Sequence, residues 1–130
     1  MMEFHRDSRS GLAPYLQIVE QVKEASRLGL ITTGDQLPTV REVVAQLAVN
    51  PNTVLKAYRM LEYEGLAEGR PGQGTFVVGT LGGLPLDTLP RIRRKLLPWL
   101  REAKDAGLDD ESILALVNST LREQAAARVA

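Results

Sequence analysis

The 130-residue sequence contains no cysteine and a single histidine, His5. Without cysteine the chain forms neither disulfides nor thiolate metal sites, and a cytoplasmic location is the default expectation. With one histidine, no Ser-His-acid set can be assembled for nucleophilic catalysis. We therefore expect a protein that is not an enzyme and that needs no metal or cofactor.

Net charge and long apolar runs are also missing. The 16 Lys and Arg residues balance 16 Asp and Glu residues, so the broad positive field of a non-specific nucleic-acid binder is absent. No apolar run is long enough for a transmembrane helix, and residues 1–10 lack the apolar core of a signal peptide. We expect no membrane partner, and we expect residues 1–10 to form a loose arm.

Three segments repeat apolar residues at helical spacing, over residues 14–28, 40–47 and 51–64. Thr39 and Glu42 have the spacing of a capping box at the start of the second segment. Asn50 followed by Pro51 predicts an N-cap and a first helical position for the third. The corner between these two helices, at residues 48–49, is short enough for a helix-turn-helix, whose second helix can enter a DNA major groove.

Two short β patterns follow, at residues 66–68 and 75–78, around the glycine-rich segment 69–74. This pattern predicts a hairpin. Helix, turn, helix and hairpin together form a winged helix, so the sequence predicts an α+β fold that binds double-stranded DNA.

A glycine-rich linker at residues 79–85 precedes two further helical patterns, over residues 88–106 and from residue 110 to the mid-120s. Pro98 conflicts with the first, because an internal proline removes a backbone hydrogen bond and kinks a helix. We therefore divide the chain into a winged-helix domain, 1–79, and a helical dimerisation segment, 80–130. Two helices of this size have little to bury themselves against, which favours a homodimer. The apolar positions expected at the dimer interface are Leu89, Ile92, Leu96, Trp99, Leu100, Ile113, Leu114, Val117 and Leu121.

The motifs GDQLPTVRE at residues 34–42, VNPNTVLKAY at 49–58, LEYEGL at 61–66 and RPGQGTFV at 70–77 occur in order. Together they closely resemble the winged-helix domain of the GntR family of bacterial transcription regulators, and the short tail resembles that of the YtrA subfamily. The resemblance implies a homodimeric repressor, often of its own operon, and leaves room for a small-molecule effector of unidentified class.

The predicted DNA contacts follow from the resemblance and from the position of each residue in its helix or hairpin. The resemblance implies that Arg41 reaches a base or phosphate, that the residues entering the third helix contact DNA, and that the wing approaches the minor groove. Exposed cap and helix positions add phosphate contacts. The full set is Thr39, Arg41, Asn50, Asn52, Thr53, Lys56, Arg70 and Gly72.

Other readings of the sequence stay open. A winged helix can also serve as a protein-interaction module without operator-specific DNA binding. An architectural DNA binder without sequence preference is disfavoured by the neutral charge. The basic cluster at residues 91–95 is typical of a solvated helix face, with DNA or acidic-effector contact as the alternative.

Overall fold

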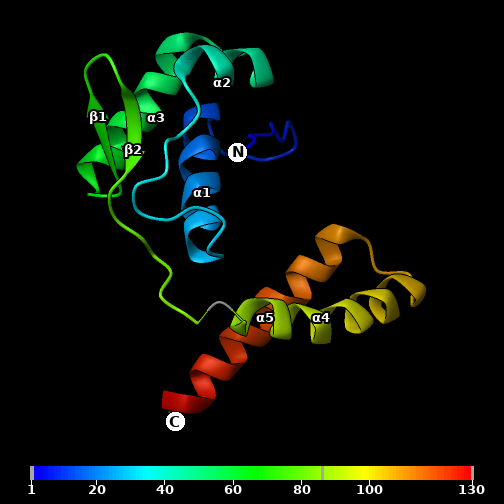
Figure 1. The fold of residues 1–130 in the computed structure, drawn as a ribbon. Helices are drawn as coiled ribbons and strands as arrows, with labels where there is room; N and C mark the ends of the chain where they lie inside the picture. Colours follow the sequence, from blue (N-terminus) through cyan, green and yellow to red (C-terminus); the bar gives the residue numbers. More distant parts are fainter. Residues whose placement is uncertain (1, 86, 130) are drawn as a thin grey trace. The chain divides into compact units, whose positions relative to one another are not determined.

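The computed structural model describes residues 2–85 and 87–129, and it divides the chain into two compact units, Met1–Leu84 and Pro85–Ala130. The order of elements is three helices, a two-stranded antiparallel hairpin and two further helices (Figure 1). This is the predicted α+β winged helix-turn-helix followed by two helices. In the described residues, no helix combines the length and apolarity that a membrane span requires.

The three helices of the first unit are α1 (Pro14–Arg27), α2 (Val40–Leu47) and α3 (Pro51–Tyr63). Each buries one face, as the helical spacing predicted. The buried apolar side chains form one core, whose helical members are Ile18, Val19, Val22, Ala25, Val43, Leu47, Val54, Ala57, Tyr58 and Leu61.

The hairpin consists of β1 (Ala67–Arg70) and β2 (Gly74–Val77), paired in the register Ala67 to Val77 and Arg70 to Gly74. The predicted strand bounds were therefore wrong: β1 begins later and extends further, and the tip is reduced to residues 71–73. The amide of Gln73 closes this tip by donating to the carbonyl of Arg70 at 2.9 Å.

The segment before α2 lies along β2. Leu37 N donates to Thr75 O at 2.8 Å, and Val77 N donates to Asp35 O at 2.8 Å. These bonds join residues about forty positions apart, a long-range pairing that local sequence signals do not report.

The prediction of a loose amino-terminal arm was wrong. Phe4 is buried in the core, and its amide donates to Gln46 Oε1 at 3.0 Å. Further along the arm, Gln17 accepts from Asp7 N at 2.9 Å and donates back to Asp7 O at 3.1 Å. The polar composition of the arm suggested disorder, but the arm is held by one buried aromatic ring and by hydrogen bonds between its backbone and glutamine side chains.

The linker is anchored over its first half. Ser26, which is buried on α1, accepts a hydrogen bond from Leu81 N at 2.9 Å. A Cβ on Gly79 would lie 2.5 Å from Gly65 O, and one on Gly82 would lie 2.9 Å from Ser26 O. Glycine at these two positions lets backbones pack closely. The glycine content of the linker therefore reflects these contacts as well as flexibility.

The second unit contains α4 (Thr88–Asp105) and α5 (Asp110–Val129). Helix α4 continues through Pro98. Asp109 lies directly before α5 as predicted and accepts from Ser112 N at 2.8 Å. Hydrogen bonding by the Ser112 side chain, and then by its backbone, lowers the pKa of the Asp109 carboxyl. Helix α5 extends beyond the predicted mid-120s, because residues after Leu121 form helix well although the apolar stripe has ended.

Docking of the arm predicts a stability effect. Phe4→Ala removes a buried aromatic ring and should lower the free energy of unfolding by about 3–5 kcal/mol, measured by urea denaturation. The matched control is Leu12→Ala in the same segment, where the side chain is 45% exposed and little should change. Equal, small effects at both positions would show that the arm is not anchored.

Candidate DNA-binding surface

The start of α2 is held by the predicted capping box. Glu42 N donates to Thr39 Oγ1 at 3.1 Å, and Thr39 N donates to Glu42 Oε1 at 3.3 Å. Arg41 lies between these two residues and is exposed. The cap therefore fixes the backbone from which the Arg41 guanidinium projects into solvent.

The turn between α2 and α3 depends on two residues. Ala48 adopts a left-handed conformation with φ 53° and ends α2, with its amide bonded to Val44 O at 2.9 Å. Asn50 then caps α3, its Oδ1 accepting from Asn52 N at 2.8 Å. Because the cap uses only the side-chain oxygen of Asn50, the two amide N–H donors are available for a phosphate or base.

The outer face of α3 is polar over its first turns. Asn50, Asn52 and Lys56 are exposed, whereas Thr53 is half-buried. The Lys56 ammonium nitrogen lies 4.0 Å from the centroid of the Tyr15 ring on α1, a cation–π contact. This contact already restricts the Lys56 side chain, so a phosphate contact would lose less side-chain conformational entropy.

Tyr58 fixes the angle between α3 and α2. Its hydroxyl donates to the carbonyl of Pro38, a fully buried residue directly before the cap of α2. Burial of the phenol, and secondarily the Glu42 carboxylate, raises the pKa of Tyr58 well above its ordinary value. The neutral donor form is thus maintained, and the two helices are linked through a bond that joins residues 20 positions apart.

Arg70 does not lie at the tip of the wing, as the sequence suggested, but at the end of β1. Its guanidinium pairs with Glu68 Oε2 at 3.4 Å and lies 4.5 Å from the centroid of the Phe76 ring. Its side chain is 43% exposed, so it can still reach solvent. Exposed ion pairs of this kind are weak and would yield to a phosphate. Gly72 is at the tip, with φ 73°.

Gln36 supports the wing, and the sequence analysis missed it. Its Nε2 donates to Gln73 O at 3.1 Å, and it forms an isolated β-bridge with Phe76. A Cβ on Gly74, where φ is 127°, would lie 2.5 Å from the same Nε2. That φ strains any other L residue, and a Cβ would displace the Gln36 amide, so glycine at position 74 lets Gln36 hold the wing against the segment before α2.

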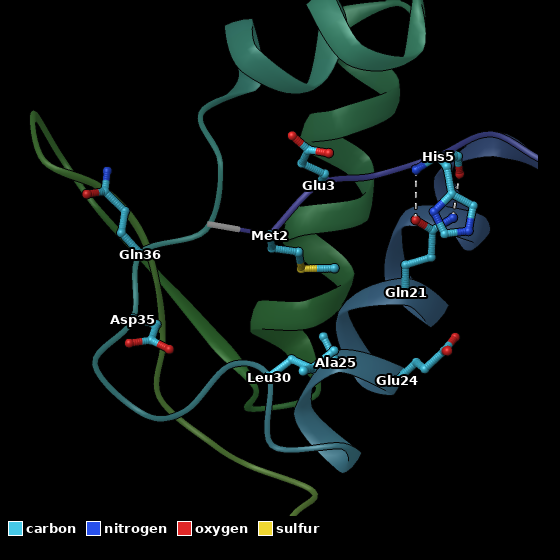
Figure 2. Close-up of a pocket in the computed structure, with 9 residues that line it drawn as sticks. All are labelled: Met2, Glu3, His5, Gln21, Glu24, Ala25, Leu30, Asp35 and Gln36. Atoms are coloured by element: carbon cyan, nitrogen blue, oxygen red, sulfur yellow. Dashed lines mark hydrogen bonds between the residues drawn. The ribbon is translucent and has the colours of Figure 1, made fainter. Parts of the chain in front are cut away.

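A cavity of about 660 Å³ opens between the arm, α1 and the segment at Leu30–Gln36. Figure 2 shows Met2, Ala25 and Leu30 among its lining side chains. Three of its polar side chains already serve the fold: Gln21 bonds the backbone of His5, Asp35 accepts from Thr32 N and Gln36 bonds the wing.

The hairpin tip, α2 and the start of α3 lie at the same end of the first unit (Figure 1). Arg41, the cap of α3 and the glycine tip of the wing are thus brought to one end, while the apolar faces of the three helices are turned inward. Two helices and a projecting hairpin at one end match the shape of a DNA major groove and its flanking minor groove.

Comparisons with known proteins agree with this geometry. Residues 14–77 match the model of the bacterial regulatory proteins of the gntR family. The transcriptional repressor YtrA of Bacillus subtilis is 46% identical over 82% of this chain and 83% of its own length. The chain belongs to the GntR family.

Solved structures of relatives support the fold of this GntR protein. YtrA from Sulfolobus acidocaldarius is 27% identical, with a TM-score of 0.53 over 92% of this chain and 97% of its own. The DNA-binding domain of AraR in complex with operator ORX1 is 28% identical, with a TM-score of 0.53 over 60% of this chain and 100% of its own. The predicted family, short YtrA-type tail and class of DNA-binding transcription regulator are confirmed. The individual contact residues stay predictions.

The Tyr58–Pro38 bond predicts a specific loss. Tyr58→Phe leaves a buried carbonyl without a donor and should lower the free energy of unfolding by about 1–3 kcal/mol, measured by thermal or urea denaturation. Tyr63→Phe is the matched control, because Tyr63 is 93% exposed. A Tyr58→Phe protein as stable as the control would contradict the role of this bond.

Proposed function

We propose that this chain is a homodimeric repressor that binds a two-fold symmetric operator upstream of its own genes. In this proposal each α3 enters a major groove, and each wing lies against a flanking minor groove. The observation that supports it most directly is the set of exposed polar and cationic residues on α2, α3 and the wing. Caps at Thr39 and Asn50 fix the backbone from which the residues of the two helices project.

Affinity in this proposal comes from placement, because the chain as a whole carries no net charge. The positive end of the α3 dipole lies at its first turn and favours a phosphate there, although Pro51 has no amide N–H and the amides of Asn52 and Thr53 are already bonded to Asn50. From Asn50 to Arg59 the sequence contains two cations and no acid. The acidic residues of this region begin at Glu62, further from the end that would enter the groove.

The homodimer is supported by the apolar surface of the second unit. Among its described residues, only Ala103 and Ile113 are buried hydrophobics. Ile113 is thus already covered within one chain. Four further apolar side chains are half-buried, at Leu89, Trp99, Leu100 and Val117. Another four are 44% to 62% exposed, at Ile92, Leu96, Leu114 and Leu121. Helices with so little of their own to bury require a partner, and a second copy would also supply the second winged helix.

Repression is proposed from the relatives. The B. subtilis YtrA protein is named a transcriptional repressor, and the AraR domain was solved on operator DNA. A protein bound across promoter DNA blocks access to it. A small-molecule effector would act by changing the spacing of the two winged helices, with a coupling free energy of about 1–3 kcal/mol.

Arg41 provides the test of DNA recognition. Arg41→Ala should weaken binding to the upstream DNA by about 1–3 kcal/mol, or roughly 5- to 150-fold, because it removes a base or phosphate contact. The measurement is a mobility-shift titration at fixed salt. Arg27→Ala is the control, since Arg27 is an exposed arginine in the last turn of α1.

Two results would oppose this assignment. If the wild-type protein does not retard its upstream DNA even at low salt, autoregulation is wrong. If Arg41→Ala binds DNA normally but loses a protein partner, the winged helix is an interaction module instead.

Dimerisation is tested on the full chain. Leu96→Asp places a charge in the apolar stripe of α4 and should convert the dimer to a monomer in sedimentation experiments, because a buried carboxylate without a partner is strongly unfavourable. Arg101→Asp, at an exposed position on the other side of the same helix, should stay dimeric. A wild-type chain that sediments as a monomer at micromolar concentration would refute the homodimer.

A further inference from the structure

One residue on the outer face of α3 does not fit a polar surface. Leu55 is 39% exposed, although the helix has a complete apolar face of its own in Val54, Ala57, Tyr58 and Leu61. Leu55 is therefore not required to complete the core. An exposed leucine on this face gains favourable free energy only when another surface covers it.

The position of Leu55 relates it to the residues proposed to contact DNA. It lies three residues after Asn52 and four residues before Arg59, so the three share neighbouring positions along the helix. Asn52 and Arg59 are both exposed. Helical side chains lean toward the amino terminus of their helix, so Leu55 covers the first turn, the part of a recognition helix that approaches base edges.

The neighbouring cation does not occupy the same space. Lys56 extends toward α1, where its ammonium nitrogen lies over the Tyr15 ring. The surface between Asn52 and Arg59 thus presents a branched apolar side chain flanked by hydrogen-bonding groups. Such a surface suits a base edge that carries an apolar group beside polar atoms.

We propose that Leu55 determines operator specificity by packing against the C5-methyl group of one thymine in each half-site. This inference rests on the proposed function. In the major groove only thymine, among the four unmodified bases, presents a methyl group, and its O4 acceptor lies beside it. Leucine has no hydrogen-bonding atom, so it selects thymine by methyl contact and desolvation, without a bond to any base.

The test removes the methyl group and leaves base pairing unchanged. A binding duplex is first selected in vitro from random DNA with the full-length wild-type protein. Each symmetric pair of thymines is then replaced by deoxyuridine, and affinities are measured by fluorescence anisotropy. At one of these thymine pairs the replacement should weaken wild-type binding. The loss should be about fourfold when one half-site is replaced and about fifteenfold when both are replaced.

Variants of Leu55 test whether the effect of deoxyuridine depends on this side chain. Leu55→Ala keeps helix propensity and should bind the thymine and deoxyuridine duplexes equally at that pair. Leu55→Met retains an apolar side chain of similar volume and should keep the preference for thymine. Leu30→Ala is the control, because Leu30 is 69% exposed and lies outside the helix, and its preference should match that of the wild type.

The outcomes separate this inference from the function on which it rests. If selection yields no binding duplex, the proposed function fails and the inference fails with it. If a duplex is bound tightly but Leu55→Ala loses as much affinity as the wild type at every deoxyuridine substitution, the methyl contact is wrong while operator binding stands.

Discussion

Burial of one face of α3 is the constraint on which the rest of the structure depends. Val54, Ala57, Tyr58 and Leu61 are turned into the core, so the opposite face of the helix is presented to solvent. The Tyr58 hydroxyl extends this constraint to α2 by bonding the carbonyl of Pro38. A helix anchored along one side and bonded to its neighbour can rotate or slide little, and this rigidity fixes which side chains its solvent face presents.

The same rigidity explains how a chain without net charge can recognise DNA. The cations are few, but several are held in place: Arg41 lies within a capping box, Lys56 lies against Tyr15, and Arg70 lies against Phe76. Gln36 holds the wing to the segment that leads into α2. Preorganised contacts lose less conformational entropy on binding, so a small number can suffice, and the proposed homodimer would double that number.

Features encoded by neighbouring residues were predictable from the sequence. The caps at Thr39, Asn50 and Asp109 and the apolar stripes of the first three helices all have local signals, and the structure agrees with them. Features that depend on distant residues were not. Three contacts form only when the chain folds, because no local pattern in the sequence indicates the partner. They are the anchoring of Phe4, the support of the wing by Gln36 and the contact of Arg70 with the Phe76 ring.

The most direct measurement of the central claim is chemical-shift mapping of the isotopically labelled full chain during titration with its upstream DNA. The account predicts that amide and methyl shifts concentrate in residues 39–42, 50–59 and 69–74, while residues 20–28 of α1 stay unchanged. Shifts confined to α4 and α5, or spread evenly over the first unit, would contradict a groove contact made by the exposed face of α3 and the wing.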